Sequence, residues 1–176
     1  VLGVFPLAMR AWAQIFVGPH TAKWAATLAV FLPAISLTRW GFGQLPTLAA
    51  TTIILFALAC GAEFLRTGQR LSLAQAVLLA GLAAALHHGV FLFVPFAGIA
   101  LLPFLFKHKA GVRVGLMRFG LWAALSAIAV AVVLWPFLIW SYGQSLQTPI
   151  DHPSRYNFFQ SWPATAFFFW PIHGPL

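Results

Sequence analysis

Residues 72–106 read SLAQAVLLAGLAAALHHGVFLFVPFAGIALLPFLF, a run without Lys, Arg, Asp or Glu. As one α-helix these 35 residues would extend about 52 Å at roughly 1.5 Å per residue, whereas the hydrocarbon core of a bilayer is about 30 Å thick. The run therefore has to turn back on itself. His87, His88 and Gly89 are its one polar interruption, and Gly89 can take the left-handed conformation of a tight turn. We predict two short helices, over residues 72–86 and 90–106.

The composition of the whole chain indicates a membrane protein. Of its 176 residues, 61% are hydrophobic and 7% are charged, and the mean hydropathy is +0.90. Soluble domains average about 45–50% apolar and about 25% charged residues, and a soluble domain of this size would leave much apolar surface in water. We predict an all-α fold, a polytopic transmembrane helix bundle that forms one domain over residues 1–176. Because the chain begins at Val1 inside an apolar segment, we interpret it as a fragment of a larger membrane protein.

Charged and turn-forming residues divide the chain into apolar segments that approach the roughly 20 residues of a spanning helix. Residues 66–70 and 107–118 are predicted to be basic loops, and Gly18, Pro19 and His20 are predicted to end the first segment. The approximate spans are residues 1–17, 22–38, 46–65, 72–86, 90–106 and 119–140, with the start of another at 162.

The distribution of positive charge favours the turn at His87 and His88. With that turn, one side of the membrane receives Lys23, Arg66, Arg70, Lys107, Lys109, Arg113 and Arg118, and the other side receives Arg39 and Arg155. Basic residues are retained in the cytoplasm, so the first set marks the inside. We expect an integral protein of a bacterial inner membrane, with membrane lipids as partners. The pI near 11.3 then follows from topology, and we expect no nucleic-acid partner.

Three polar stretches fall on the outer face in this topology: TRWGFGQLP at 38–46, HHG at 87–89 and DHPSRYNFF at 151–159. They supply the candidate substrate-binding residues, which are Arg39, Gln44, His87, His88, Asp151 and Arg155.

Each of these residues also has a purely structural interpretation. Arg39, beside Trp40, is either an interfacial anchor or a clamp for phosphate oxygens, and Gln44 could bind a sugar hydroxyl. His87 and His88 either satisfy the carbonyls of a helix end or line a polar site at the membrane rim. Adjacent histidines point about 100° apart on a helix, so we predict no metal site.

The second outer cluster leaves the same choice open. Asp151 pairs with Arg155, caps a turn or acts as a general base, while Arg155 could bind an anionic headgroup. Glu63 is predicted to pair with Arg66. No nucleotide-binding, zinc-protease or serine-hydrolase motif occurs, so we predict no cofactor and identify no catalytic residue.

Residues 39–46 (RWGFGQLP), followed by a long span, a short basic loop and two short helices around the histidine pair, resemble polytopic glycosyltransferases of the C-type fold. The segment from about 18 to 106 is also similar to bacterial multi-pass proteins described as 6-pyruvoyl-tetrahydropterin synthase-related, without implying pterin chemistry. The resemblance implies a lipid-linked sugar donor, reaction on the outer face, and a catalytic acidic residue in a loop preceding Val1. The resemblance also implies that Arg39, Gln44, His87 and His88 contact the sugar donor or the acceptor substrate.

We therefore expect part of a lipid-phosphate-sugar-dependent glycosyltransferase acting on the extracytoplasmic face. Arg39 and Arg155 would hold the phosphate of a polyprenyl-phosphate sugar donor as it departs. One alternative is a transporter or flippase for a lipid-linked substrate, because Pro33, Pro95 and Pro103 can break helices at membrane depth. The other alternative is a non-catalytic membrane subunit.

Overall fold

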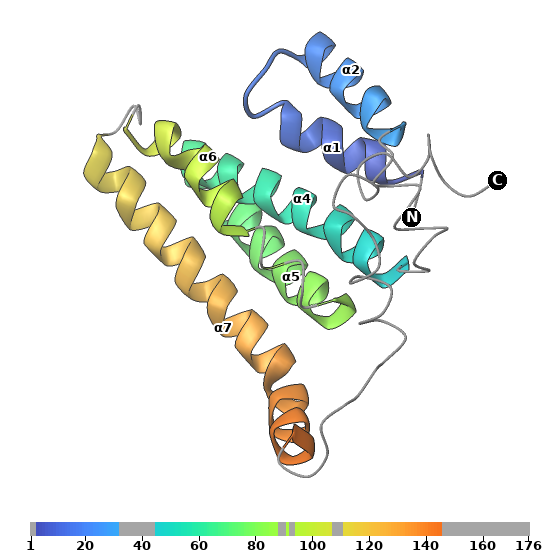
Figure 1. The fold of residues 1–176 in the computed structure, drawn as a ribbon. Helices are drawn as coiled ribbons and strands as arrows, with labels where there is room; N and C mark the ends of the chain where they lie inside the picture. Colours follow the sequence, from blue (N-terminus) through green and yellow to red (C-terminus); the bar gives the residue numbers. More distant parts are fainter. Residues whose placement is uncertain (1–2, 32–44, 88–90, 92–93, 107–110, 146–176) are drawn as a thin grey trace, which may run out of the picture.

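The computed structural model describes residues 3–31, 45–87, 91, 94–106 and 111–145. Within these ranges every regular element is a helix, which confirms the predicted all-α class for this part of the chain (Figure 1). The helices are α1 (Phe5–Ala13), α2 (Pro19–Val30), α4 (Leu45–Thr67), α5 (Arg70–Leu86), α6 (Val94–Phe106) and α7 (Val112–Ser145).

The helices differ in whether they could cross a bilayer. In the described part, α4 and the Val112–Pro136 portion of α7 are long and apolar enough to do so. Arg70–Leu86 and Val94–Pro103 are apolar but shorter, and α1 and α2 have 9 and 12 residues. Of the predicted spans, only 46–65 and 119–140 correspond to helices of spanning length within the described residues.

The break expected inside residues 72–106 is present. α5 ends at Leu86, His87 is its C-cap residue with an extended backbone, and α6 begins at Val94. The run is thus two helices, and the second begins four residues later than predicted. His88 and Gly89 lie outside the described residues.

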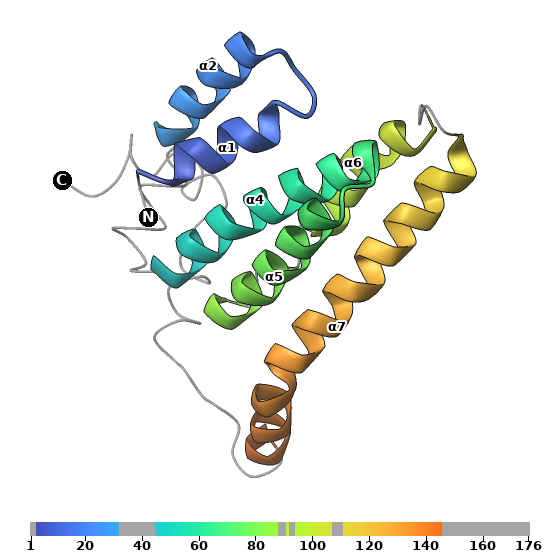
Figure 2. The same cartoon turned by 180° about the vertical axis from the view of Figure 1, so that it is seen from behind.

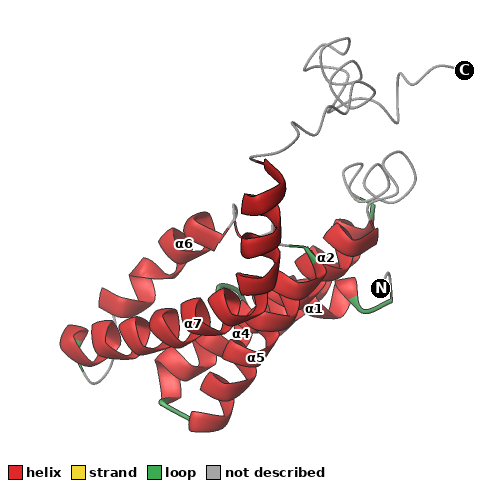
Figure 3. Cartoon of the chain, turned by 90° about the horizontal axis from the view of Figure 1, so that it is seen from below, coloured by secondary structure: helices red, strands yellow, loops and turns green. Residues whose placement is uncertain are grey.

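The predicted loop at 107–118 is wrong in its second half. α7 begins at Val112, directly after Gly111, whose φ of +93° stops the helix from starting earlier. Arginine is a good helix former, so Arg113 and Arg118 lie on the first turns of α7 rather than in a loop. The helix also continues past 140 to Ser145. Figure 3 shows its last turns running in a new direction, and Pro136 accounts for the bend because it lacks an N–H and clashes with the preceding turn.

Contacts between distant residues define the directions of the helices. Arg118 of α7 bonds to Leu65 near the end of α4, while Gly81 of α5 faces Ala129 and Val133 of α7. Therefore α7 runs parallel to α5 and antiparallel to α4, as Figures 1 and 2 show from opposite sides.

One end of the bundle carries Arg66, Arg70, Arg113 and Arg118, and we call it the basic end. The other end, where α4 begins and where α5 and α7 finish, is called the far end.

Small residues form the contact between α4 and α5. The buried residues of α5 are Ser72, Ala76, Ala80, Gly81, Ala83 and Ala84. Four of them recur at every fourth position, which places them on one face of the helix. Side chains this small let two helix backbones approach closely, as membrane helices do.

The helices α1 and α2 form a hairpin that packs on α4. Phe5 of α1, Ala29 of α2 and Leu48 of α4 share a small apolar cluster. The predicted interruption occurs at Gly18, which is extended, whereas Pro19 and His20 already belong to α2. Proline suits this first helical position because its missing N–H would have no partner there in any case.

Candidate functional site

An apolar cavity of about 790 Å³ lies between α4, α5, α6 and α7. Pockets for small molecules usually measure about 300–1,000 Å³ and are mainly apolar. The walls are aliphatic and aromatic, and include Ile54, Leu58, Ala80, Leu102, Phe119 and Leu134. The cavity follows α7 from Phe119 to Leu134, which is about 22 Å along the helix axis.

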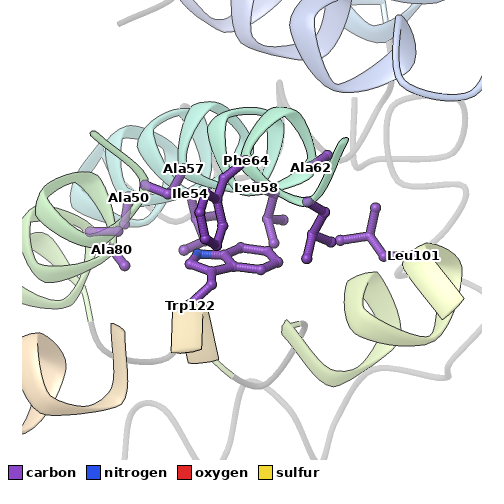
Figure 4. Packing of buried hydrophobic residues seen from close by; sticks show 12 residues of the cluster. Ala50, Ile54, Ala57, Leu58, Ala62, Phe64, Ala80, Leu101 and Trp122 are labelled. Atoms are coloured by element: carbon purple, nitrogen blue, oxygen red, sulfur yellow. The ribbon is translucent and has the colours of Figure 1, made fainter. Parts of the chain in front are cut away.

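Trp122 of α7 is the largest side chain that lines this cavity. Its side chain points from α7 toward α4, with Leu101 of α6 to one side (Figure 4), and it is 8% exposed. A Cβ atom at Gly61 would overlap the six-membered ring of the indole, so the absence of a side chain there lets the ring lie against α4. Phe119 supports the indole edge-on, with 6.0 Å between the ring centroids.

Ser126 is the one hydroxyl-bearing residue among those that line the cavity. Its Oγ atom is buried and has no hydrogen-bond partner among the described residues. The cavity therefore presents an almost uninterrupted apolar surface, which suits a hydrocarbon chain better than a polar ligand.

At the basic end, Arg118 connects α7 to the end of α4. Its Nη1 donates hydrogen bonds to the carbonyl oxygens of Leu65 at 3.0 Å and Arg66 at 3.3 Å. These carbonyls belong to the last turn of a helix, where oxygens lack partners within the helix. Gly68 then reverses the chain with a φ of +75°, and its N–H donates to the carbonyl of Phe64 at 2.8 Å.

Among the described residues at the basic end, the positive charges outnumber the negative ones. Glu63 pairs with Arg66 at 3.3 Å, as the sequence predicted. It is the only acidic residue within the described ranges. Arg70 and Arg113 are exposed at the first turns of α5 and α7, so this end carries a net positive charge.

Of the candidate substrate-binding residues, the structure describes His87. It is half-buried at the far end, and its backbone N–H donates to the carbonyl of Ala83 at 3.0 Å. The other candidates lie outside the described residues, namely Arg39, Gln44, His88, Asp151 and Arg155. Within the described ranges no three His, Cys, Asp or Glu side chains are grouped so that they could hold a metal ion.

The described helix termini at or near the three polar stretches nevertheless lie at one end of the bundle. Leu45 begins α4, His87 follows α5 and Ser145 ends α7. All three helix termini lie at the far end, opposite the basic end, because α4 is antiparallel to α5 and α7.

Sequence reasoning did not identify Gly61, Trp122 or Arg118 as structural determinants. The spacing of Ala57 and Gly61 offered a signal for the first, because small residues four apart mark close helix contacts. No local signal shows that Arg118 bonds to carbonyls that lie more than 50 positions earlier in the chain.

Comparisons with known proteins do not assign a function to the chain, so the functional argument rests on the geometry described above. The chain matches no model of a known protein family, and no significant similarity to a curated protein or to a solved structure was found.

Proposed function

We propose that this chain is the membrane-embedded part of a lipid-phosphate-sugar-dependent glycosyltransferase that acts on the extracytoplasmic face of a bacterial inner membrane. Arg39 and Arg155 would bind the phosphate of a polyprenyl-phosphate sugar. A guanidinium presents a planar set of donors to phosphate oxygens and stabilises the charge that develops as the phosphate leaves.

The observation that carries this proposal is the common location of three helix termini. The start of α4, the end of α5 and the end of α7 all lie at the far end of the bundle. Each terminus leads into one of the three polar stretches, 38–46, 87–89 and 151–159. A phosphate clamp built from Arg39 and Arg155 requires these stretches to emerge from the same end.

Insertion in a membrane is supported by the outer surface of α7. Its exposed large apolar residues include Met117, Leu121, Ile128, Val132, Trp135 and Ile139. Successive members are three, four or seven positions apart, so they form a single stripe along the helix. A soluble monomer rarely exposes an apolar surface this extensive, whereas acyl chains of a bilayer would cover it without cost.

The polar termini and the basic end agree with this orientation. If α4 and α7 cross the bilayer, the basic end lies on the side where Lys and Arg are retained, which is the cytoplasm. The far end then faces outward. This is the side on which the resemblance to C-type enzymes places sugar transfer.

Sugar transfer tests the proposal directly. Membranes containing the full chain are incubated with a panel of polyprenyl-phosphate sugars that carry tritium in the sugar. Arg39→Ala and Arg155→Ala should each lower incorporation at least tenfold, while Lys23→Ala, an exposed change on α2, should not. Transfer at the original rate in both arginine variants would refute the clamp.

A labelling experiment tests the orientation separately. Cys60 is the only cysteine in the sequence, so Cys60→Ser provides a background without thiols. Leu86→Cys, beside His87, should react with an impermeant maleimide added outside intact cells. Gln69→Cys, exposed in the turn between α4 and α5, should react after permeabilisation only. The reverse pattern would overturn the topology.

A further inference from the structure

The proposed sugar transfer takes place at the far end of the bundle. It gives no role to the apolar cavity or to the arginines of the basic end. We propose that the cavity between α4, α5, α6 and α7 holds an acyl chain of an anionic glycerophospholipid whose headgroup binds at the basic end. This inference depends on insertion in a membrane and does not depend on glycosyltransferase activity.

The dimensions of the cavity suit one acyl chain of a lipid. It extends about 22 Å along α7, which exceeds the roughly 15 Å depth of a single bilayer leaflet. Water gains little in a space with such walls, because apart from Ser126 they offer it almost no hydrogen-bond partners. A hydrocarbon chain needs none.

The position of the cavity connects it to the positive charge. Its lining includes Leu102 near the end of α6 and Phe119 on α7, and Phe119 directly follows Arg118. Arg70 and Arg113 are exposed at the same end. A lipid with its chain in the cavity would therefore have its headgroup at the level of these arginines.

The charge determines which lipid is preferred. A chain gains little by moving from bulk lipid into the cavity, since both surroundings are equally apolar. Selection therefore has to come from the headgroup. Basic pockets between helices on the cytoplasmic side bind anionic headgroups. Glu63 neutralises Arg66, so among the described residues Arg70 and Arg113 are the ones that should select an anionic lipid.

Tryptophan fluorescence can report whether a lipid occupies the cavity. Trp122 lines the cavity and is 8% exposed, whereas Trp135 lies on the outer surface of α7 and is 63% exposed. Two variants each keep one of these residues and replace the other seven tryptophans of the chain by phenylalanine. The full chain is reconstituted in phosphatidylcholine vesicles that contain brominated phosphatidylglycerol or brominated phosphatidylcholine.

The proposal makes a distinct prediction for each reporter. Brominated phosphatidylglycerol should quench Trp122 at least threefold more strongly than brominated phosphatidylcholine, while Trp135 should be quenched similarly by both. The double variant Arg70→Gln/Arg113→Gln should remove the preference at Trp122, because each arginine near the surface changes anionic-lipid binding about fivefold. Lys23→Gln removes a charge from α2 and should preserve the preference.

Each other outcome would overturn the assignment. Equal quenching of Trp122 by both lipids would mean that the cavity takes bulk lipid without selection. Quenching of Trp135 alone would mean that no lipid enters, and quenching of neither would refute insertion. Displacement of the brominated lipid by undecaprenyl phosphate at a lower concentration than by phosphatidylglycerol would reassign the site to a polyprenyl phosphate.

A second measurement avoids the tryptophan substitutions. Native mass spectrometry of the unmodified chain, released from nanodiscs with equal amounts of the two lipids, should retain phosphatidylglycerol. The Arg70→Gln/Arg113→Gln variant should lose it. Equal retention of both lipids by the unmodified chain would contradict the proposal, whatever the fluorescence shows.

Discussion

Replacing Gly61 by alanine should destabilise the bundle by forcing Trp122 away from α4. Of the three indole atoms nearest to the new Cβ, the most distant, Cη2, would lie 2.5 Å from it. Optimal contact between carbon atoms is about 3.5–4.0 Å, so the ring has to move by roughly 1 Å or more, toward the cavity. Overpacking of this kind costs about 1–3 kcal/mol, which is roughly a 5- to 150-fold change in the folding equilibrium.

Thermal unfolding in detergent micelles, followed by circular dichroism, measures this loss. At about 2–4 °C per kcal/mol for a domain of this size, Gly61→Ala should lower Tm by roughly 2–12 °C. Gly120→Ala is the matched control, because a Cβ at that helical position meets no atom within 4 Å. It should leave Tm unchanged or raise it slightly, since alanine favours a helix over glycine by up to about 1 kcal/mol.

The cause can be isolated by adding Trp122→Leu to Gly61→Ala. If the overlap with the indole is responsible, the double variant should be more stable than the sum of the two single losses, by about 1 kcal/mol or more. Strictly additive losses, or a Gly61→Ala protein as stable as Gly120→Ala, would refute the reasoning.

Three further substitutions probe the basic end, each measured by the same unfolding assay. Arg118→Leu should destabilise the chain by about 1.5–3 kcal/mol, because helix-terminal carbonyls lose charged hydrogen bonds; a smaller loss than for Glu63→Gln would contradict this role. Gly68→Ala should cost about 1–2 kcal/mol, since its φ of +75° is strained for alanine, whereas Gly98→Ala, in open space, should cost nothing. Glu63→Gln should cost less than about 1 kcal/mol, because the pair is exposed to 40% at the carboxylate and 64% at the guanidinium. A larger loss would show that this pair contributes to the fold.

The exposed surface of α7 agrees with the proposed insertion in lipid. Among the described residues of α7, Trp122 is the one with a buried side chain, and most of the large apolar residues are exposed. The buried residues of α5, by contrast, are all alanine, glycine or serine. Large apolar side chains outside and small ones inside are what a helix bundle in lipid requires, since lipid solvates the former and close packing uses the latter.

The break between α5 and α6 and the helical class of the described part could be predicted from the sequence alone. Both depend on local properties, namely the length of the charge-free run and the polar residues at His87 and His88. The pairing of Glu63 with Arg66 was predictable for the same reason, because residues three apart on a helix are neighbours.

Only the tertiary structure decided where the cavity lies and how its wall is made. The contact of Gly61 with Trp122, and the bonds from Arg118 to the end of α4, join residues more than 50 positions apart. Such contacts depend on how closely two helices approach and at which rotation they meet. Those quantities follow from the packing of all four helices together, and no window of sequence contains them.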